Sequence, residues 1–282
     1  MLRCRFATLF TAGATLALLA IACGGNSPAA TPFPTATTRF QTSGPTTPPT
    51  RPPSATTGPL VTGQPMPTIG TGAKTFPAAP ALGIDANKRY FAVLNTNKGT
   101  VRLELLPKQA PQTVNSFVFL ARNGYYNGVK FHRVIGVGPN FPSGFMIQGG
   151  DPYTVDDSKS AQWGTGTPGY SLPDEFLCAD GKISNQLHPT CTVVESAQFT
   201  KGGQLAMANT GGPHTGGSQF FITLAAHSFL NGGYTLFGQV QSGMDIVQAI
   251  GAVSTDCTRK VPGCVDRPDQ PVIIQSVTIE EL

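Results

Sequence analysis

Four segments between residues 131 and 222 place charged or amide side chains among large apolar ones. The segments are 131–135, 145–151, 207–209 and 217–222. Their polar members are Arg133, Gln148, Asn209 and Gln219, and their apolar members include Phe145, Met146, Ala208 and Phe221. A core strand seldom holds amides among aromatic rings without a hydrogen-bond partner. The mixture therefore favours a shallow apolar pocket with hydrogen-bond donors aimed at its contents.

Arg133 is the residue in these segments best suited to chemistry. Its guanidinium stays charged and presents its N–H groups in a rigid fork, so it can stabilise a group that gains a lone pair. Taken alone, Arg133 would be interpreted as a surface arginine near a strand end. The phenylalanine and methionine residues would likewise be interpreted as strand core.

Together and in this order, the four segments resemble the signature segments of cyclophilins, the peptidyl-prolyl cis-trans isomerases. The resemblance covers roughly residues 90–282. It implies catalysis of rotation about the amide bond before proline, whose barrier of roughly 18–20 kcal/mol comes from amide resonance. A catalyst must prefer the twisted amide to either planar form. The resemblance implies that Arg133 donates a hydrogen bond to the proline nitrogen, which regains its lone pair in the twisted state.

The resemblance also implies roles for the other residues. Gln148 would contact the substrate backbone near Arg133. Asn209 would make backbone hydrogen bonds to the residue before proline, with Ala208 beside it, and Gln219 would help to line the groove. The proline pocket would be lined by Phe145, Met146, Phe221 and Leu230.

Three features depart from the usual cyclophilin pattern. Nine residues, 136–144, stand where typical members have a much shorter connection, and they adjoin the expected site. Phe229 stands where many members have tryptophan, whose indole N–H contacts cyclosporin, so we expect reduced sensitivity to that drug. Tyr234 stands where many members have histidine, and its hydroxyl can still donate a hydrogen bond.

The elements that must position these residues are mostly short strands. Alternating or continuous apolar runs bounded by turn residues predict eight strands, at 90–95, 100–105, 129–135, 145–148, 203–208, 219–223, 237–240 and 272–279. Apolar residues spaced three and four apart predict helices at 111–123 and 242–250, with Ser242 as the cap of the second. The pattern alone allows a sandwich or a barrel. The resemblance implies a closed eight-stranded antiparallel barrel with a helix over each open end.

The first 83 residues have a different composition from the rest. A basic start and an apolar run of 17 residues, 6–22, predict a signal peptide at 1–22. The tract ending in Cys23 resembles a bacterial lipoprotein processing site, and the alternative is an ordinary cleaved signal with a bystander cysteine. Residues 24–83 hold 13 of the 25 prolines and no hydrophobic period. We therefore predict a disordered tether at 23–83 and a folded domain at 84–282. The prolines of the tether could instead be ligands of that domain.

The charge of the predicted domain argues against nucleic-acid binding. Five of the 19 basic residues and none of the 15 acidic ones precede residue 84, so the domain carries 14 − 15 = −1 rather than the +4 of the whole chain. No basic cluster with interleaved aromatics is present, so nucleic-acid binding is not expected.

The four cysteines of the predicted domain pair most simply as disulfides Cys178–Cys191 and Cys257–Cys264, because an exported domain lies in an oxidising compartment. A four-cysteine zinc site is the alternative, but the spacings lack a C-x-x-C pair.

These observations predict a monomeric, extracytoplasmic isomerase held at a membrane by a lipid on Cys23, or secreted if that cysteine is not acylated. Its partners would be exported proline-containing polypeptides. No cofactor or metal is expected, and Ser218 lies outside a Gly-x-Ser-x-Gly hydrolase motif. Two alternatives remain open at this point. One is a peptide-binding module or holdase that uses the same groove without turnover, and the other is a structural cell-surface protein.

Overall fold

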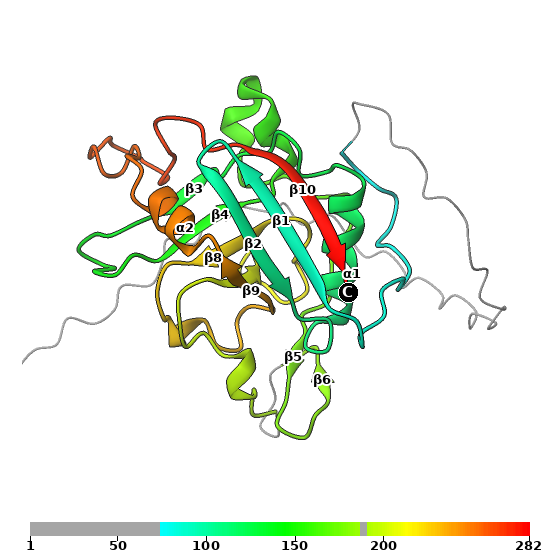
Figure 1. Cartoon of the computed structure of the whole chain (residues 1–282). Coiled ribbons are helices and arrows are strands. Elements are labelled where there is room, and N and C mark those ends of the chain that lie inside the picture. The colour runs from blue at the N-terminus through cyan, green and yellow to red at the C-terminus, as the bar shows by residue number, and fades with distance from the viewer. Residues whose placement is uncertain (1–73, 187–190) are drawn as a thin grey trace, which may run out of the picture. The chain divides into compact units, whose positions relative to one another are not determined.

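The computed structural model describes residues 74–186 and 191–282. Eight strands form one antiparallel sheet in the order β10-β1-β2-β9-β7-β8-β4-β3 (Figure 1). They are β1 (Tyr90–Thr96), β2 (Gly99–Leu105), β3 (Arg133–Ile135), β4 (Met146–Gly149), β7 (Gln204–Met207), β8 (Phe220–Thr223), β9 (Leu236–Ser242) and β10 (Ile274–Glu281). Each overlaps one of the eight predicted strands, and the two predicted helices are also present.

The sheet curls so that its edge strands β3 and β10 approach each other. The chain just before β3 bonds to the chain at the start of β10: Gly128 N–H donates to the Ile274 carbonyl at 2.8 Å, and Phe131 N–H donates to the Val272 carbonyl at 2.9 Å. In return, Ile274 N–H donates to the Val129 carbonyl at 2.8 Å. These bonds close the seam, which confirms the predicted barrel.

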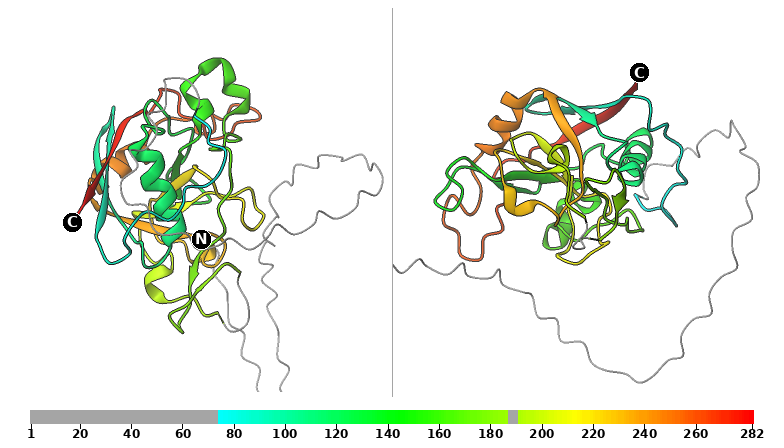
Figure 2. Two further views of the ribbon diagram at one scale, coloured as in Figure 1. Left: turned by 90° about the vertical axis from the view of Figure 1, so that its right-hand side faces the viewer. Right: turned by 90° about the horizontal axis from the view of Figure 1, so that it is seen from below.

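The helices α1 (Pro111–Arg122) and α2 (Met244–Gly251) lie on opposite sides of the strands (Figures 1 and 2). The predicted apolar face of α1 is buried, and Pro111 occupies its first turn. The start of α2 differs from the prediction, because Ser242 ends β9 and Gly243 is the N-cap, with φ +85°. A Cβ at Gly243 would lie 2.4 Å from the Thr100 carbonyl oxygen. The tight turn from β9 into α2 therefore needs glycine and leaves no capping role for Ser242.

Aromatic side chains fill the interior of the barrel. Phe220 is fully buried there, and the rings of Phe117, Tyr126 and Phe131 meet it edge-on at centroid distances of 5.7, 5.7 and 6.2 Å. Edge-to-face contacts at such distances are favourable for aromatic pairs. Because side chains occupy the interior, any substrate must bind on the outer face of the sheet.

The packed part of the chain begins before the predicted boundary at residue 84. Phe76 packs edge-on against Phe119 at 4.9 Å, and its N–H donates to the Pro168 carbonyl at 2.7 Å. Lys74 Nζ donates to the Tyr125 and Asn127 carbonyls at 2.7 and 2.6 Å. Residues 74–83, assigned to the tether from composition, therefore pack against the domain.

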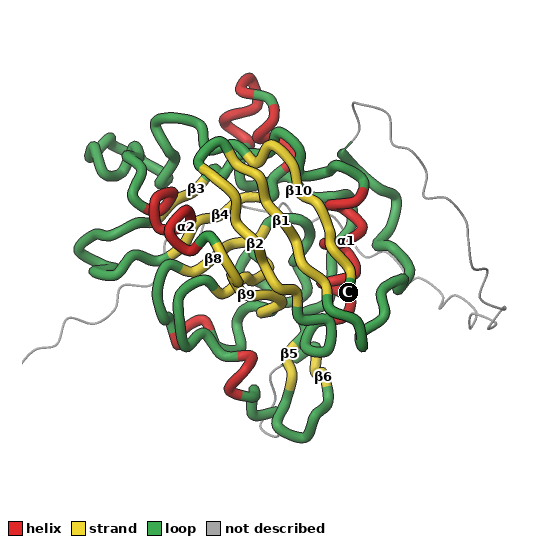
Figure 3. Tube along the Cα trace, viewed as in Figure 1, coloured by secondary structure: helices red, strands yellow, loops and turns green. Residues whose placement is uncertain are grey.

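The segment between β4 and β7 contains short elements that the sequence did not predict. A small hairpin pairs β5 (Phe176–Leu177) with β6 (Ile183–Ser184), and it projects away from the barrel (Figure 3). Short 3₁₀ helices occur in this segment at Pro152–Val155, Asp157–Gln162 and Glu195–Ala197, and a fourth, Ser228–Leu230, lies between β8 and β9. Among the described residues, none of the helices has both the length and the apolar character needed to cross a membrane.

Candidate active site

Alternation along the strands divides the apolar residues into an inner and an outer set. On β4, Ile147 belongs to the barrel core, whereas Met146 belongs to a second cluster. On β8, Phe220 and Ile222 belong to the core, whereas Phe221 belongs to the second cluster. Since neighbouring residues of a strand point to opposite faces, the second cluster lies on the outside of the barrel.

This outer apolar cluster contains every residue predicted to line a proline pocket. Its buried members are Met146, Phe199, Ala206, Phe221, Leu230 and Leu236, and its partly buried members are Leu106, Ile135, Phe145, Ala208 and Tyr234. The rings of Phe221 and Tyr234 meet edge-on at 5.3 Å. The interpretation of these residues as barrel core is therefore wrong. Phe199 and Leu236 were missed, because only the folding of the chain brings them under the cluster.

Strand register places the polar residues beside this cluster. Arg133 on β3 pairs with Gln148 on β4, Gln148 pairs with Phe221 on β8, and Phe221 pairs with Ala206 on β7. Directly opposite residues of antiparallel strands project from the same face, with their Cβ atoms about 4.5–5.5 Å apart. These residues therefore form one row across four strands on the outer face. The row begins at the cation of Arg133, passes the amide of Gln148 and ends in the outer apolar cluster at Phe221 and Ala206.

An amide network begins at Gln148, the second residue of this row. Gln148 Nε2 donates to Gln219 Oε1 at 3.1 Å, and Gln219 Nε2 donates to the Gly164 and Gly166 carbonyls at 3.0 and 2.9 Å. Gln148 and Gln219 line a cavity of about 350 Å³, together with Ala208 and Asn209. The chain at 164–167, which sequence reasoning missed, lines the same cavity.

The side chain of Asn209 connects two loops beside this cavity. Its Nδ2 donates to the Gly233 carbonyl at 2.8 Å, and its Oδ1 accepts from the Gly211 N–H at 3.0 Å. Ala208 N–H donates to the Gln219 carbonyl at 2.9 Å. These bonds hold Asn209 and Ala208 in place along the cavity wall.

A second cavity, of about 390 Å³, lies on the Arg133 side of Gln148. Its lining includes Arg133, Gln148, Asp266 and Arg267. Arg133 Nε lies 3.6 Å from Asp266 Oδ2, and 44% of the Arg133 side chain is exposed. Burial raises the pKa of the Asp266 carboxyl above its ordinary value, although the charge of Arg133 opposes this shift. Gln148 and Gly164 line both cavities, so the two adjoin at these residues.

The insertion at 136–144 reshapes the rim of the apolar cluster. It places the ring of Phe141 on the ring of Phe145, with centroids 4.6 Å apart. Phe229 is 62% exposed at the same rim, and its ring lies 5.5 Å from that of Phe145. Phe141 was not among the predicted site residues, and the one available signal was an aromatic residue inside an insertion next to the site.

His132 directly precedes β3 and is among the residues that line the cavity beside Arg133. It is buried, and among the described residues neither ring nitrogen has a hydrogen-bond partner. Burial lowers the pKa of His132 to about 4, so the ring is neutral near pH 7. It cannot serve as a second cation beside Arg133.

Two disulfides have the connectivity expected from neighbouring cysteines. Cys178 is bonded to Cys191, and Cys257 is bonded to Cys264. The first staples the β5–β6 hairpin region, and the second closes a loop that reaches the cavity beside Arg133. Cys23 lies outside the described residues.

Comparison with known proteins supports a common family. A family model described as cyclophilin type peptidyl-prolyl cis-trans isomerase/CLD matches residues 91–279. Peptidyl-prolyl cis-trans isomerase B of Streptomyces anulatus is 38% identical, with 68% of this chain and 98% of that protein covered. Peptidyl-prolyl cis-trans isomerase-like 1 of Aspergillus fumigatus is 40% identical, with 67% of this chain and 95% of that protein covered.

A solved structure shares the fold. The crystal structure of a Cryptosporidium parvum cyclophilin type peptidyl-prolyl cis-trans isomerase, in the presence of the dipeptide Ala-Pro, matches with a TM-score of 0.51 and 27% sequence identity. The match covers 67% of this chain and 98% of that one. With the matched family model spanning the whole barrel, the chain belongs to the cyclophilin-type peptidyl-prolyl cis-trans isomerases.

Proposed function

We propose that the row from Arg133 to Phe221 is the catalytic centre of this isomerase. The outer apolar cluster binds the proline ring, and Arg133 donates a hydrogen bond to the proline nitrogen as the amide twists. The planar amide offers no free lone pair at that nitrogen, so the interaction strengthens only in the twisted state. The observation that carries the proposal is the strand register, which sets Arg133 and Gln148 on the same outer face as Phe221.

The amide network holds the peptide backbone while the bond rotates. Gln148 binds the substrate backbone next to Arg133, and the main chain of Asn209 binds the residue before proline. Gln219 lines the groove and fixes the orientation of the Gln148 amide through its 3.1 Å hydrogen bond. Support comes from the related Cryptosporidium parvum protein, which was crystallised in the presence of Ala-Pro.

The test compares isomerisation of a proline-containing tetrapeptide by the full chain and by its Arg133→Ala variant. We expect kcat/KM to fall roughly 10²-fold or more, the usual loss when one donor to a transition state is removed. Arg259→Ala is the matched control, because Arg259 pairs with Asp269 on the surface at 2.6 Å. A folded Arg133→Ala variant that retains the activity of the control would refute the role of Arg133.

We further propose that the enzyme acts on exported proteins from a membrane anchor. Residues 1–22 direct export, Cys23 carries the lipid, and the Pro/Thr-rich tether before the domain spaces it from the membrane. Two disulfides fit an oxidising compartment. Uncatalysed proline isomerisation takes about 10–100 s at 25 °C, so it can limit folding after export.

Mass spectrometry of the mature N-terminus tests the anchor. The expected product begins at Cys23, carries acyl chains and sediments with membranes. Cys23→Ser should move the protein to the soluble fraction. A mature wild-type chain that lacks acyl groups would instead identify a secreted enzyme.

A further inference from the structure

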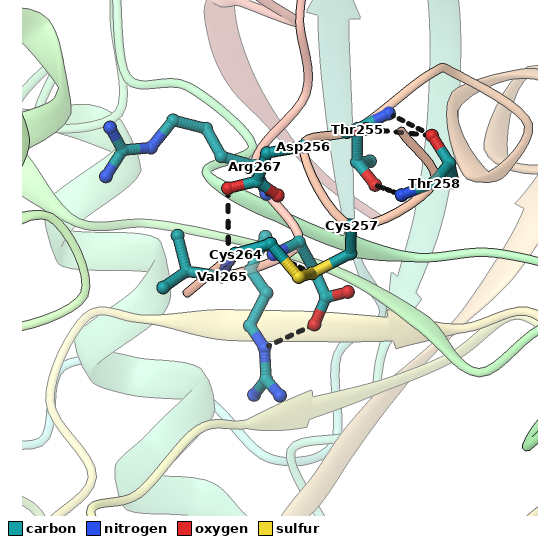
Figure 4. The surroundings of a disulfide bond; sticks show 9 residues. Thr255, Asp256, Cys257, Thr258, Cys264, Val265 and Arg267 are labelled. Atoms are coloured by element: carbon teal, nitrogen blue, oxygen red, sulfur yellow. Dashed lines mark hydrogen bonds and ion pairs between the residues drawn. A yellow bond between two sulfur atoms is a disulfide. The ribbon is translucent and has the colours of Figure 1, made fainter. Parts of the chain in front are cut away.

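The chain between α2 and β10 forms a closed loop next to Arg133. We call residues 255–268 the cystine loop, since Thr255 and Pro268 bridge its ends and the Cys257–Cys264 disulfide crosses it. Figure 4 shows Asp256 inside the loop, where its carboxylate accepts from the backbone N–H of Val265 at 3.0 Å. It also accepts from the Arg267 N–H at 2.9 Å. The residue between these two, Asp266, is therefore held from both sides.

Asp266 itself has an unusual backbone conformation. Its φ is +61°, in the left-handed region that only glycine, asparagine and aspartate visit readily. Its N–H donates to Cys257 Sγ at 3.2 Å. Its carbonyl accepts from the Val134 N–H at 2.8 Å, which ties the loop to β3 one residue after Arg133. The disulfide-closed loop thus fixes the backbone of Asp266 against the strand that carries Arg133.

The carboxylate of Asp266 contacts only one side of the Arg133 guanidinium. The ion pair runs from Asp266 Oδ2 to Nε at 3.6 Å. Among the described residues, the Arg133 side chain makes no other ion pair. Because this contact is to Nε, the two outer nitrogens of the guanidinium can donate to a substrate. An unpaired arginine on this rim would sample many rotamers, because its side chain carries about 2 kcal/mol of rotamer entropy.

We propose that Asp266 is a positioning residue, which holds the Arg133 guanidinium by its Nε so that an outer nitrogen meets the twisted amide of the substrate. This inference rests on the role proposed for Arg133 above. It assigns a function to the cystine loop, which forms part of the wall of the cavity beside Arg133. Asp266 acts through Arg133 and has no contact with the reacting atoms.

Three other charged or titratable groups lie near this contact. His132 precedes Arg133, while Asp256 and Arg267 come from the cystine loop itself. Only the ionised form of Asp266 can hold Arg133, so kcat should fall as the pH falls through the pKa of Asp266. Burial raises that pKa above its ordinary value, which moves the loss of activity toward neutral pH.

Asp266→Asn is the decisive variant. Asparagine has nearly the same shape and also tolerates the left-handed backbone, so the variant removes the charge and preserves the loop. We expect kcat to fall roughly three- to tenfold, the cost of ordering one long side chain at the moment of reaction. KM should change little, because the lost interaction acts in the transition state. The acid limb of the kcat profile should move or disappear, although His132 still titrates in the variant.

Asp269→Asn is the matched control, because Asp269 pairs with Arg259 at 2.6 Å just beyond the cystine loop and does not line either cavity. The full chain carrying it should keep the wild-type kcat and pH profile. In the Arg133→Ala background, Asp266→Asn should cause no further loss. Removal of the disulfide, by Cys257→Ser with Cys264→Ser, should also lower kcat roughly three- to tenfold. Adding Asp266→Asn to this disulfide-free variant should not lower kcat further.

The possible outcomes separate this inference from the proposed function. If Arg133→Ala abolishes activity but Asp266→Asn matches Asp269→Asn, the positioning role is refuted and the role of Arg133 stands. If Asp266→Asn lowers thermal stability and kcat but keeps the wild-type acid limb, Asp266 is merely structural. If Arg133→Ala remains active, the role of Arg133 fails and the positioning role fails with it.

Discussion

The ring of Phe141 is stacked on the ring of Phe145, with centroids 4.6 Å apart and planes inclined by 12°. Phe141 belongs to the insertion at 136–144, and Phe145 lies at the edge of the outer apolar cluster. Reciprocal backbone hydrogen bonds between Gly138 and Phe141, at 3.0 and 3.1 Å, fix the turn. His227 Nε2 donates to the Gly144 carbonyl at 2.9 Å and fixes its base. The insertion thereby adds an ordered aromatic surface to the pocket rim.

Phe141→Ala should weaken binding of peptides that carry an aromatic residue next to proline. An aromatic contact contributes about 0.5–1.5 kcal/mol beyond its buried area, so KM should rise roughly two- to tenfold while kcat changes little. Steady-state kinetics with aromatic and alanine-containing tetrapeptides measures the difference. Val137→Ala is the control, because Val137 lies in the same insertion and is 73% exposed. Equal KM values for the two variants would contradict the prediction.

His132 should make folding stability depend on pH between about 6.5 and 4. The folded pKa of about 4 lies below the ordinary value of 6.5 because burial disfavours the charged ring. Between these values the unfolded chain binds a proton that the folded chain does not, so stability falls as the pH falls. The loss should reach on the order of 3 kcal/mol, measured by urea unfolding at several pH values.

Replacement of His132 by leucine should flatten this part of the pH profile. The substitution removes ring nitrogens that have no hydrogen-bond partner among the described residues, and it keeps an apolar side chain in a buried position. An unaltered slope in the His132→Leu variant would show that other groups carry the pH dependence.

Glu175 should be important for stability, although it is not one of the site residues. Its carboxylate accepts from the backbone N–H groups of Gln112 and Thr113 at 3.0 and 2.9 Å, and from the Thr113 hydroxyl at 2.8 Å. Glu175→Gln turns an amide NH₂ toward these donors, so the free energy of unfolding should fall by about 1–3 kcal/mol. Urea unfolding measures the change, and the exposed Glu195→Gln is the control. A Glu175→Gln variant as stable as the control would contradict this capping role.

Phe229→Trp should increase inhibition by cyclosporin. The phenyl ring of Phe229 lies exposed at the rim and has no N–H to donate, whereas an indole ring has one. A neutral hydrogen bond contributes about 0.5–1.5 kcal/mol, so the inhibition constant should fall roughly two- to tenfold. Titration of tetrapeptide isomerisation with the drug measures it, and kcat/KM without drug should stay near the wild-type value. Unchanged inhibition would mean that the insertion, and not Phe229, controls access.

Local pattern in the sequence was sufficient to predict the barrel strands and both helices. Inward-facing residues such as Ile147 and Phe220 alternate with outward-facing ones such as Gln148 and Phe221, and a period of two marks a strand in any tertiary context. The types of the site residues could also be read directly, because a guanidinium and two amides among aromatics are uncommon in a core. The start of α2 could not be predicted from local pattern. The left-handed turn at Gly243 is set by the close approach of the Thr100 carbonyl, which leaves no room for a Cβ.

Contacts between distant parts of the chain were decided only by the tertiary structure. The N-cap residue of α1, Ala110, makes no side-chain cap, and Glu175 supplies that function from more than 60 residues away. Asp266 reaches Arg133, and Phe76 packs on Phe119, through the same kind of long-range contact. The alternation of residue types along one strand indicates which face of that strand is buried. Strand register, closure of the barrel and docking of the loops each depend on the summed free energy of many contacts between distant residues. The sequence pattern therefore identified the residues of the site, and only the tertiary structure showed which residues surround them.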